Sequence, residues 1–123
     1  MVILEKYLKG VLQQIDDSCT LLQNLKDKPG DLQIIHRELA KINGLFAALL
    51  NKLNTNKQEL SDYQHILSPI KQYLDSHEFF REIDTMSPLY SDDPMRLRNL
   101  RLSILDSLTE NNLLEHVKSI LRE

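Results

Sequence analysis

The segment LQIIHRELAKINGLFAALLNKL, residues 32–53, decides the fold class of this chain. Its large apolar side chains recur every three or four residues, which is the spacing of one face of an α-helix. Burying a side chain of this kind contributes about 1.5–3 kcal/mol, whereas ordering the backbone costs about 1–2 kcal/mol for every residue of the helix. The segment therefore predicts a helix that is stable only because other elements pack against it. The apolar positions are Leu32, Ile35, Leu39, Ile42, Phe46, Leu49 and Leu53.

The opposite side of this predicted helix carries little bulk. Ala40, Gly44 and Ala48 are spaced by four residues, and Leu45 lies beside them; these four residues are called the outer strip. Gly44 costs a helix interior about 1 kcal/mol relative to alanine, and close approach of another backbone is one physical reason to accept that cost. We expect the outer strip to be packed against a helix of the same chain. The alternatives are a partner protein or a second copy of the chain, or that Gly44 has no such role.

Other parts of the chain show the same helical spacing. Residues 3–26 and residues 97–108 each place apolar side chains on one face, and residues 76–84 and 113–121 carry shorter patterns. The stretch 32–74 allows two arrangements, because its seven-residue phase is unbroken. One is a single long helix bent at Pro69, and the other is two helices separated at 54–56. We favour the break, because Asn54, Thr55 and Asn56 are three consecutive weak helix formers.

Loop and capping signals complete the architecture. Residues 85–94 have no periodicity and form the clearest predicted loop, after which Asp93 is suited to cap a helix that begins at Pro94. Asp31 is likewise expected to cap the helix that follows it. The sequence predicts one all-α domain over 1–123, an antiparallel bundle of five or six helices. Its expected parts are a main bundle over 1–84, the loop 85–94 and a C-terminal helical hairpin over 95–123.

Charge and cysteine content limit the classes of partner. The net charge is −3, which disfavours broad attraction to nucleic acid or to an anionic membrane surface. No run of eighteen uncharged apolar residues occurs, so no membrane span is expected. Cys19 is the single cysteine and lies on an apolar stripe, which predicts a buried thiol in a reducing compartment, the cytoplasm. Residues 76–94 hold one basic and five acidic side chains, a net charge of −4.

No pattern in the sequence indicates catalysis. The four histidines have no metal-ligand spacing, and the chain has no nucleophile elbow and no glycine-rich phosphate loop. Acidic neighbours, Asp16 and Asp17, would raise the pKa of Cys19 rather than activate its thiol. We therefore expect no enzyme activity, no cofactor and no metal.

The sequence favours a non-catalytic cytoplasmic module for protein–protein interaction. Such a module acts as an adaptor, a chaperone-like protein or an inhibitory regulator, and binds its partner through apolar helix faces that include Ala40, Gly44, Leu45 and Ala48. A homo-oligomer is one form of this hypothesis.

The alternative is a nucleic-acid-associated regulator that uses Arg98 and Arg101, which share one helix face. If Arg96, Arg98 and Arg101, the one local cationic cluster, are structural instead, we expect them to pair with Asp92, with Asp93 or with the acids of residues 76–84.

Overall fold

The protein is helical in the computed structural model, which describes residues 2–76 and 78–123. No strand occurs among these residues, so the predicted all-α class is confirmed. The α-helices are α1 (Val2–Asn24), α2 (Asp31–Thr55), α3 (Leu67–Ser76), α4 (Phe79–Met86), α5 (Pro94–Thr109) and α6 (Leu113–Leu121), and the 3-10 helices are η1 (Ser61–Ile66) and η2 (Glu110–Asn112).

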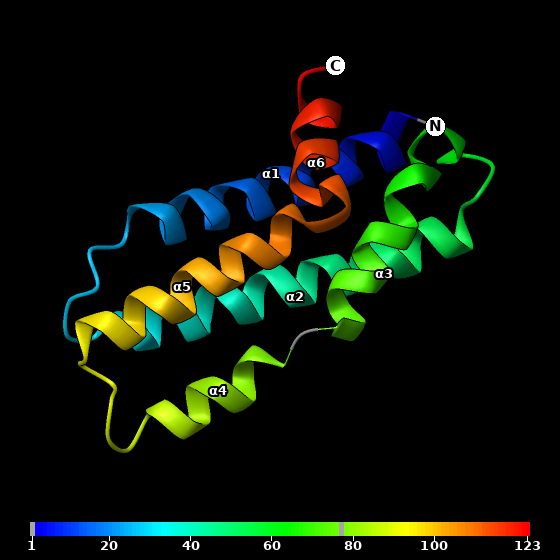
Figure 1. The fold of residues 1–123 in the computed structure, drawn as a ribbon. Helices are drawn as coiled ribbons and strands as arrows, with labels where there is room; N and C mark the ends of the chain where they lie inside the picture. The colour runs from blue at the N-terminus through cyan, green and yellow to red at the C-terminus, as the bar shows by residue number, and fades with distance from the viewer. Residues whose placement is uncertain (1, 77) are drawn as a thin grey trace.

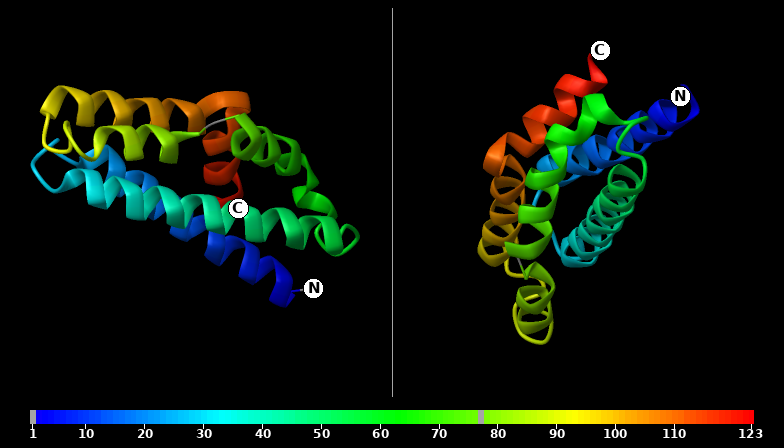
Figure 2. Two further views of the ribbon diagram at one scale, coloured as in Figure 1. Left: turned by 90° about the horizontal axis from the view of Figure 1, so that it is seen from below. Right: turned by 90° about the vertical axis from the view of Figure 1, so that its right-hand side faces the viewer.

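Four helices of ten or more residues form the main body of the described chain: α1, α2, α3 and α5. The helices α4 and α6 are shorter, so the expected number of five or six helices is not matched exactly. Figure 1 shows α1 and α2 running antiparallel, with α5 beside them and α4 at the far edge from α1. Figure 2 shows α1 along one flank of α2, and α3, α4 and α5 along the other.

The predicted break after the second helix is confirmed. Helix α2 ends at Thr55, and both the backbone N–H and the side-chain amide of Asn56 donate to the carbonyl oxygen of Lys52. The pattern over 60–74 is not one α-helix, because η1 precedes α3. Pro69 falls in the first turn of α3, where its missing N–H leaves no intrahelical hydrogen bond unmade.

The two predicted aspartate caps have different outcomes. Asp93 Oδ1 accepts from the backbone N of Met95 at 2.9 Å and of Arg96 at 3.3 Å, which confirms the cap at the start of α5. The Asp31 carboxylate instead accepts from the backbone N of Lys28 at 2.9 Å. Asp31 therefore closes the turn before α2, and the prediction that it caps α2 is wrong.

Helix α6 does not fold back along α5. Asn111 and Asn112 both have left-handed backbone conformations, with φ of 55° and 58°, which asparagine tolerates better than most residues. The chain leaves this turn at a steep angle to α5, and α6 packs on α1 (Figures 1 and 2). The turn geometry directs α6 across the bundle, but α6 still contacts α5. The description of residues 95–123 as a C-terminal helical hairpin stays a prediction.

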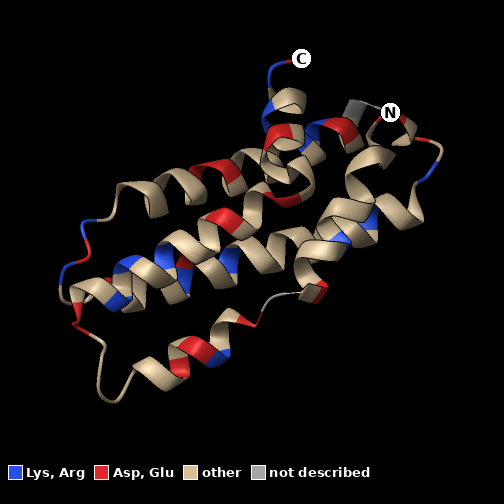
Figure 3. Ribbon diagram, in the orientation of Figure 1, with Lys and Arg blue, Asp and Glu red and all other residues tan. Residues whose placement is uncertain are grey.

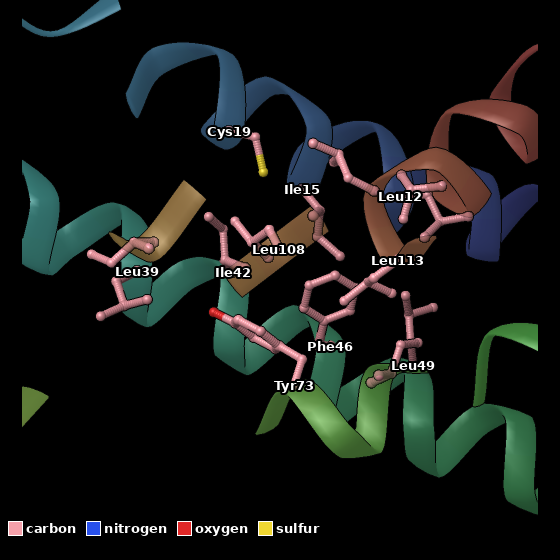
Figure 4. Packing of buried hydrophobic residues seen from close by; sticks show 14 of the residues in the cluster. Leu12, Ile15, Cys19, Leu39, Ile42, Phe46, Leu49, Tyr73, Leu108 and Leu113 are labelled. Carbon is pink, nitrogen blue, oxygen red and sulfur yellow. The ribbon is translucent and has the colours of Figure 1, made fainter. Parts of the chain in front are cut away.

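One hydrophobic core joins the helices, and Figure 4 shows its centre. Every apolar position of the residue 32–53 pattern is buried, as predicted. The ring of Phe46 lies 5.5 Å from that of Tyr73 in α3, and the Tyr73 hydroxyl donates to Asn43 Oδ1 at 2.6 Å. These contacts attach α3 to one flank of α2, and the hydrophobic contacts of α1 cover the other flank.

Candidate interaction surface

Ala40 and Gly44 of the outer strip face away from the rest of the chain, whereas Leu45 packs against the edge of the hydrophobic core. Ala40 and Gly44 are exposed, and Leu45 and Ala48 are half-buried. A Cβ atom placed on Gly44 would meet no neighbouring atom within 4 Å. The expectation that another helix of the same chain covers this strip is therefore wrong. The physical reason is that α1, α3, α4 and α5 all pack against the apolar half of α2 and leave its other half open.

The charged side chains that α2 presents at the surface are all basic. Its two acids, Asp31 and Glu38, are buried. Arg37 and Lys41 are exposed, and Lys52 is half-buried. The outer half of α2 is thus a face of small side chains bordered by cations, although the whole chain is acidic.

Glu38 is ionised in spite of its burial. Burial alone raises the pKa of its carboxyl group, but the hydrogen bond from Arg37, the Ser18 hydroxyl and the positive charges of Arg37 and Lys41 together lower it by more, so the pKa lies below its ordinary value. The Arg37 Nε atom donates to Glu38 Oε2 at 2.8 Å, while the Arg37 side chain remains 64% exposed. Arg37 therefore compensates the buried charge and still reaches the surface beside the outer strip.

Three residues of α1 extend this surface past the edge of α2. Tyr7 is 41% exposed and Ile3 is 74% exposed, and the Lys52 Nζ atom lies 5.5 Å from the centre of the Tyr7 ring. Gly10 is also exposed, with no atom within 4 Å of a Cβ placed on it. Gly10 follows Tyr7 by three residues, about one helical turn further along α1. Ile3, Tyr7 and Gly10 are called the α1 rim.

Arg101 is bound to a distant part of its own chain. Its Nε and Nη2 atoms donate to the two carboxylate oxygens of Asp27, at 2.9 Å and 3.1 Å. Its Nη1 atom also approaches the backbone carbonyl oxygens of Leu22 and Gln23 at 3.4 Å, at the end of α1. The side chain is only 11% exposed. Arg101 thus satisfies carbonyl groups that the last turn of a helix leaves without partners, and its ion-pair partner is not among the acids we had expected.

The other two arginines of α5 lie in different surroundings. The guanidinium carbon of Arg96 lies 3.7 Å from the centre of the Tyr90 ring, a close cation–π contact. Arg98 is exposed. Arg98 and Arg101 share a helix face, as the spacing predicts, but one projects into water and the other into the ion pair with Asp27. The structure therefore does not bring them together as a joint cationic site.

A groove of about 620 Å³ lies between α4 and the start of α5. Its walls carry charges of both signs, including Glu82, Arg81 and Arg96. A smaller groove of about 240 Å³ lies between α4 and α2. The sequence pattern indicates neither groove, because both depend on the distance between α4 and the helices beside it. Neither groove concentrates one charge or one kind of reactive group.

The described part of the chain presents few side chains suited to nucleophilic catalysis or to metal binding. Cys19 is buried as predicted, and burial together with Asp16 raises the pKa of its thiol to about 12. Its thiolate, the nucleophilic form, is therefore scarce at neutral pH. Among residues 2–76 and 78–123, no group of three or more His, Cys, Asp or Glu side chains could hold a metal ion. The rings of His65 and His116 meet edge to face at 5.1 Å.

Comparison of the chain with protein-family models, with curated proteins and with solved structures found no match. None of the described helices has the length and apolar character needed to cross a membrane. The outer strip, its bordering cations and the α1 rim together form the candidate interaction surface of this chain.

Proposed function

We propose that this chain is a non-catalytic, cytoplasmic protein that acts by binding another protein through the outer face of α2. An adaptor, a chaperone-like protein and an inhibitory regulator all work in this way. The observation that carries the proposal is that Ala40 and Gly44 are exposed in the middle of the longest helix, while four other helices pack on its opposite half. The short helices α4 and α6, counted with the four long ones, make the supporting scaffold a bundle of six helices among the described residues.

Gly44 supports this proposal because packing within the chain gives no reason for it. Glycine costs a helix interior about 1 kcal/mol relative to alanine, and nothing in the chain approaches Gly44 closely enough to exclude a Cβ atom. Small side chains let the backbone of a neighbouring helix come close. The contacts of a closely packed partner helix at this position would offset the loss of helix stability that Gly44 causes in the free protein.

The alternative function, nucleic-acid binding through Arg98 and Arg101, has less support. Arg101 is engaged with Asp27 and the end of α1, so its guanidinium group is not presented to a phosphate. Of the two arginines, Arg98 is the one that is exposed on this face of α5. Recognition of a nucleic-acid backbone uses several cations together.

Site-specific photocrosslinking tests the proposed function. A photoreactive amino acid would replace Ala40 or Ala47, which are both exposed on the outer half of α2, and a control would carry it at Ser103, exposed on α5. In extract of the native cell, we expect Ala40 and Ala47 to capture the same protein and Ser103 not to capture it. Unlabelled wild-type protein should compete, and the Gly44→Leu variant should compete much less.

Two outcomes would count against this function. One is equal capture from Ser103 and from the two α2 positions. The other is undiminished competition by Gly44→Leu. If the captured protein is a second copy of the chain, sedimentation of the purified protein should show a dimer that Gly44→Leu dissociates.

A further inference from the structure

We propose that the partner contacts this face with an acidic amphipathic helix, seated along the outer strip and against the α1 rim. This inference rests on the proposed function and names the kind of partner. It has two independent supports, which are the sign of the charges around the face and the exposed apolar side chains at its edge.

The first support is the charge of α2. Arg37, Lys41 and Lys52 border the outer strip, and both acids of the helix are buried. Residues 78–94 of the acid-rich segment lie at the edge of the molecule that is opposite to α1 (Figure 3), and they approach α2 near its start, where Asp84 lines a groove with Gln33 and His36. An approaching helix therefore meets positive charge on this face, although the protein as a whole is negative, and complementary charges accelerate and orient such an encounter.

The second support is the α1 rim. Ile3 and Tyr7 are large apolar side chains that remain exposed, and Tyr7 is held beside α2 by its contact with Lys52. Aromatic side chains of this kind are enriched at the centres of protein interfaces. A helix that lies over the flat surface at Gly10 and Gly44 would bring its own apolar side chains against Tyr7. The geometry thus calls for small and apolar side chains on one side of the partner helix and Asp or Glu on its flanks.

A second copy of the chain fits this face less well. Packing the face against itself would place Arg37, Lys41 and Lys52 of both copies in one interface. Like charges brought together oppose association. A helix with acidic flanks removes this repulsion, and for that reason we infer a different protein as the partner.

Two synthetic peptides would serve as probes, one of repeated Glu-Ala-Ala-Leu units and one of repeated Lys-Ala-Ala-Leu units. Each would be titrated into the isotope-labelled full chain, and the amide resonances would be followed by NMR. We expect saturable binding of the glutamate peptide, with perturbations over residues 37–52 and 3–10. The affinity should fall several-fold as salt rises from about 50 mM to about 300 mM, because exposed charges are screened. The lysine peptide should not bind.

Charge-reversal variants provide the matched control. Replacing Lys41 and Lys52 together by glutamate should weaken binding of the glutamate peptide about tenfold or more, because two attractive contacts become repulsive. Arg98→Glu changes an exposed cation on α5, which packs on the opposite half of α2, and should leave the affinity unchanged. Thermal unfolding of all variants would show that the fold is retained.

Several results would overturn the inference. These are no binding of the glutamate peptide at millimolar concentration, equal binding of the lysine peptide, or perturbations confined to the groove between α4 and α5. The photocrosslinking experiment separates this failure from failure of the proposed function. A specific protein captured at Ala40 and Ala47 that contacts the face without an acidic helix would leave the proposed function standing and overturn only the inference.

Discussion

Arg101 and Asp27 hold the end of α1 against α5 through two hydrogen bonds, although 74 residues separate them in the sequence. Asp27 has a left-handed backbone with φ of 60°, which turns its carboxylate back towards the bundle. The hydrogen bonds from Arg101 to Asp27 raise the pKa of the guanidinium group further above its ordinary value. This pair therefore fixes the position of the link between α1 and α2, in addition to the hydrophobic core.

We predict that Asp27→Asn lowers the free energy of unfolding by about 2–3 kcal/mol, because it leaves the mostly buried guanidinium group without an anion. Asparagine tolerates the left-handed backbone at this position, so the effect reports the lost charge and not backbone strain. Urea unfolding followed by circular dichroism would measure the change. Arg98→Ala is the control and should stay within about 0.5 kcal/mol of wild type. Equal stability of Asp27→Asn and wild type would show that the pair contributes nothing.

Replacing each of the three glycines by alanine is expected to change the free energy of unfolding, upward at two positions and downward at the third. Gly10→Ala and Gly44→Ala should each raise the free energy of unfolding of the isolated chain by about 0.5–1 kcal/mol, because both positions are helical and open. Gly30→Ala should lower it by about 1 kcal/mol or more, because Gly30 has φ of 93°. Thermal unfolding of the three variants tests this. A loss of stability in Gly44→Ala would show that the outer strip is covered in the free protein after all.

Cys19 should be unreactive in the folded protein. Its side chain is 1% exposed, and its pKa is raised to about 12, so both access and thiolate formation are suppressed. We expect a thiol reagent such as dithionitrobenzoate to react slowly at pH 8 and rapidly once urea unfolds the chain. A Cys placed at Gln13 in a Cys19→Ala background is the exposed control. Fast native-state reaction of Cys19 would disprove the burial of this part of α1.

Acid should destabilise the protein in part through Glu38. The pKa of Glu38 is lower in the folded chain than in the unfolded chain, so the unfolded state takes up a proton first as pH falls. The stabilisation is complete above the ordinary glutamate pKa, about 4.3, and is lost as pH falls through the lower folded-state value. Glu38→Gln should cost about 1 kcal/mol at pH 7 and should flatten the decline of stability at acidic pH.

Unfolding titrations between neutral and strongly acidic pH would measure this slope. Glu5 also has a lowered pKa, because the Tyr63 hydroxyl donates to it. Tyr63→Phe therefore separates the two contributions, and part of the slope should persist in Glu38→Gln. An unchanged slope in Glu38→Gln would mean that the buried carboxylate does not titrate in this range.

The sequence by itself determined the features that depend on neighbouring residues. The apolar period over 32–53 identified the buried face of α2, and Asp93 with Pro94 marked the start of α5. Asn54, Thr55 and Asn56 marked the end of α2, because weak helix formers act on the local backbone. The helix period, the helix break and the Asp93 cap involve residues within about one turn of each other, so the sequence predicted them. It did not predict that the Asp31 carboxylate accepts from Lys28, in the turn before α2.

Only the tertiary structure decided which surfaces are open and which charges are paired. The spacing of Ala40, Gly44 and Ala48 shows a face without bulk, but whether another helix covers it depends on where distant segments pack. Arg101 pairs with Asp27 because folding places the middle of α5 beside the link that follows α1, which no local pattern encodes. The same holds for α6, whose direction follows from the two left-handed asparagines and its packing on α1. Burial and ion pairing are properties of three-dimensional neighbours, and only the folded chain specifies those neighbours.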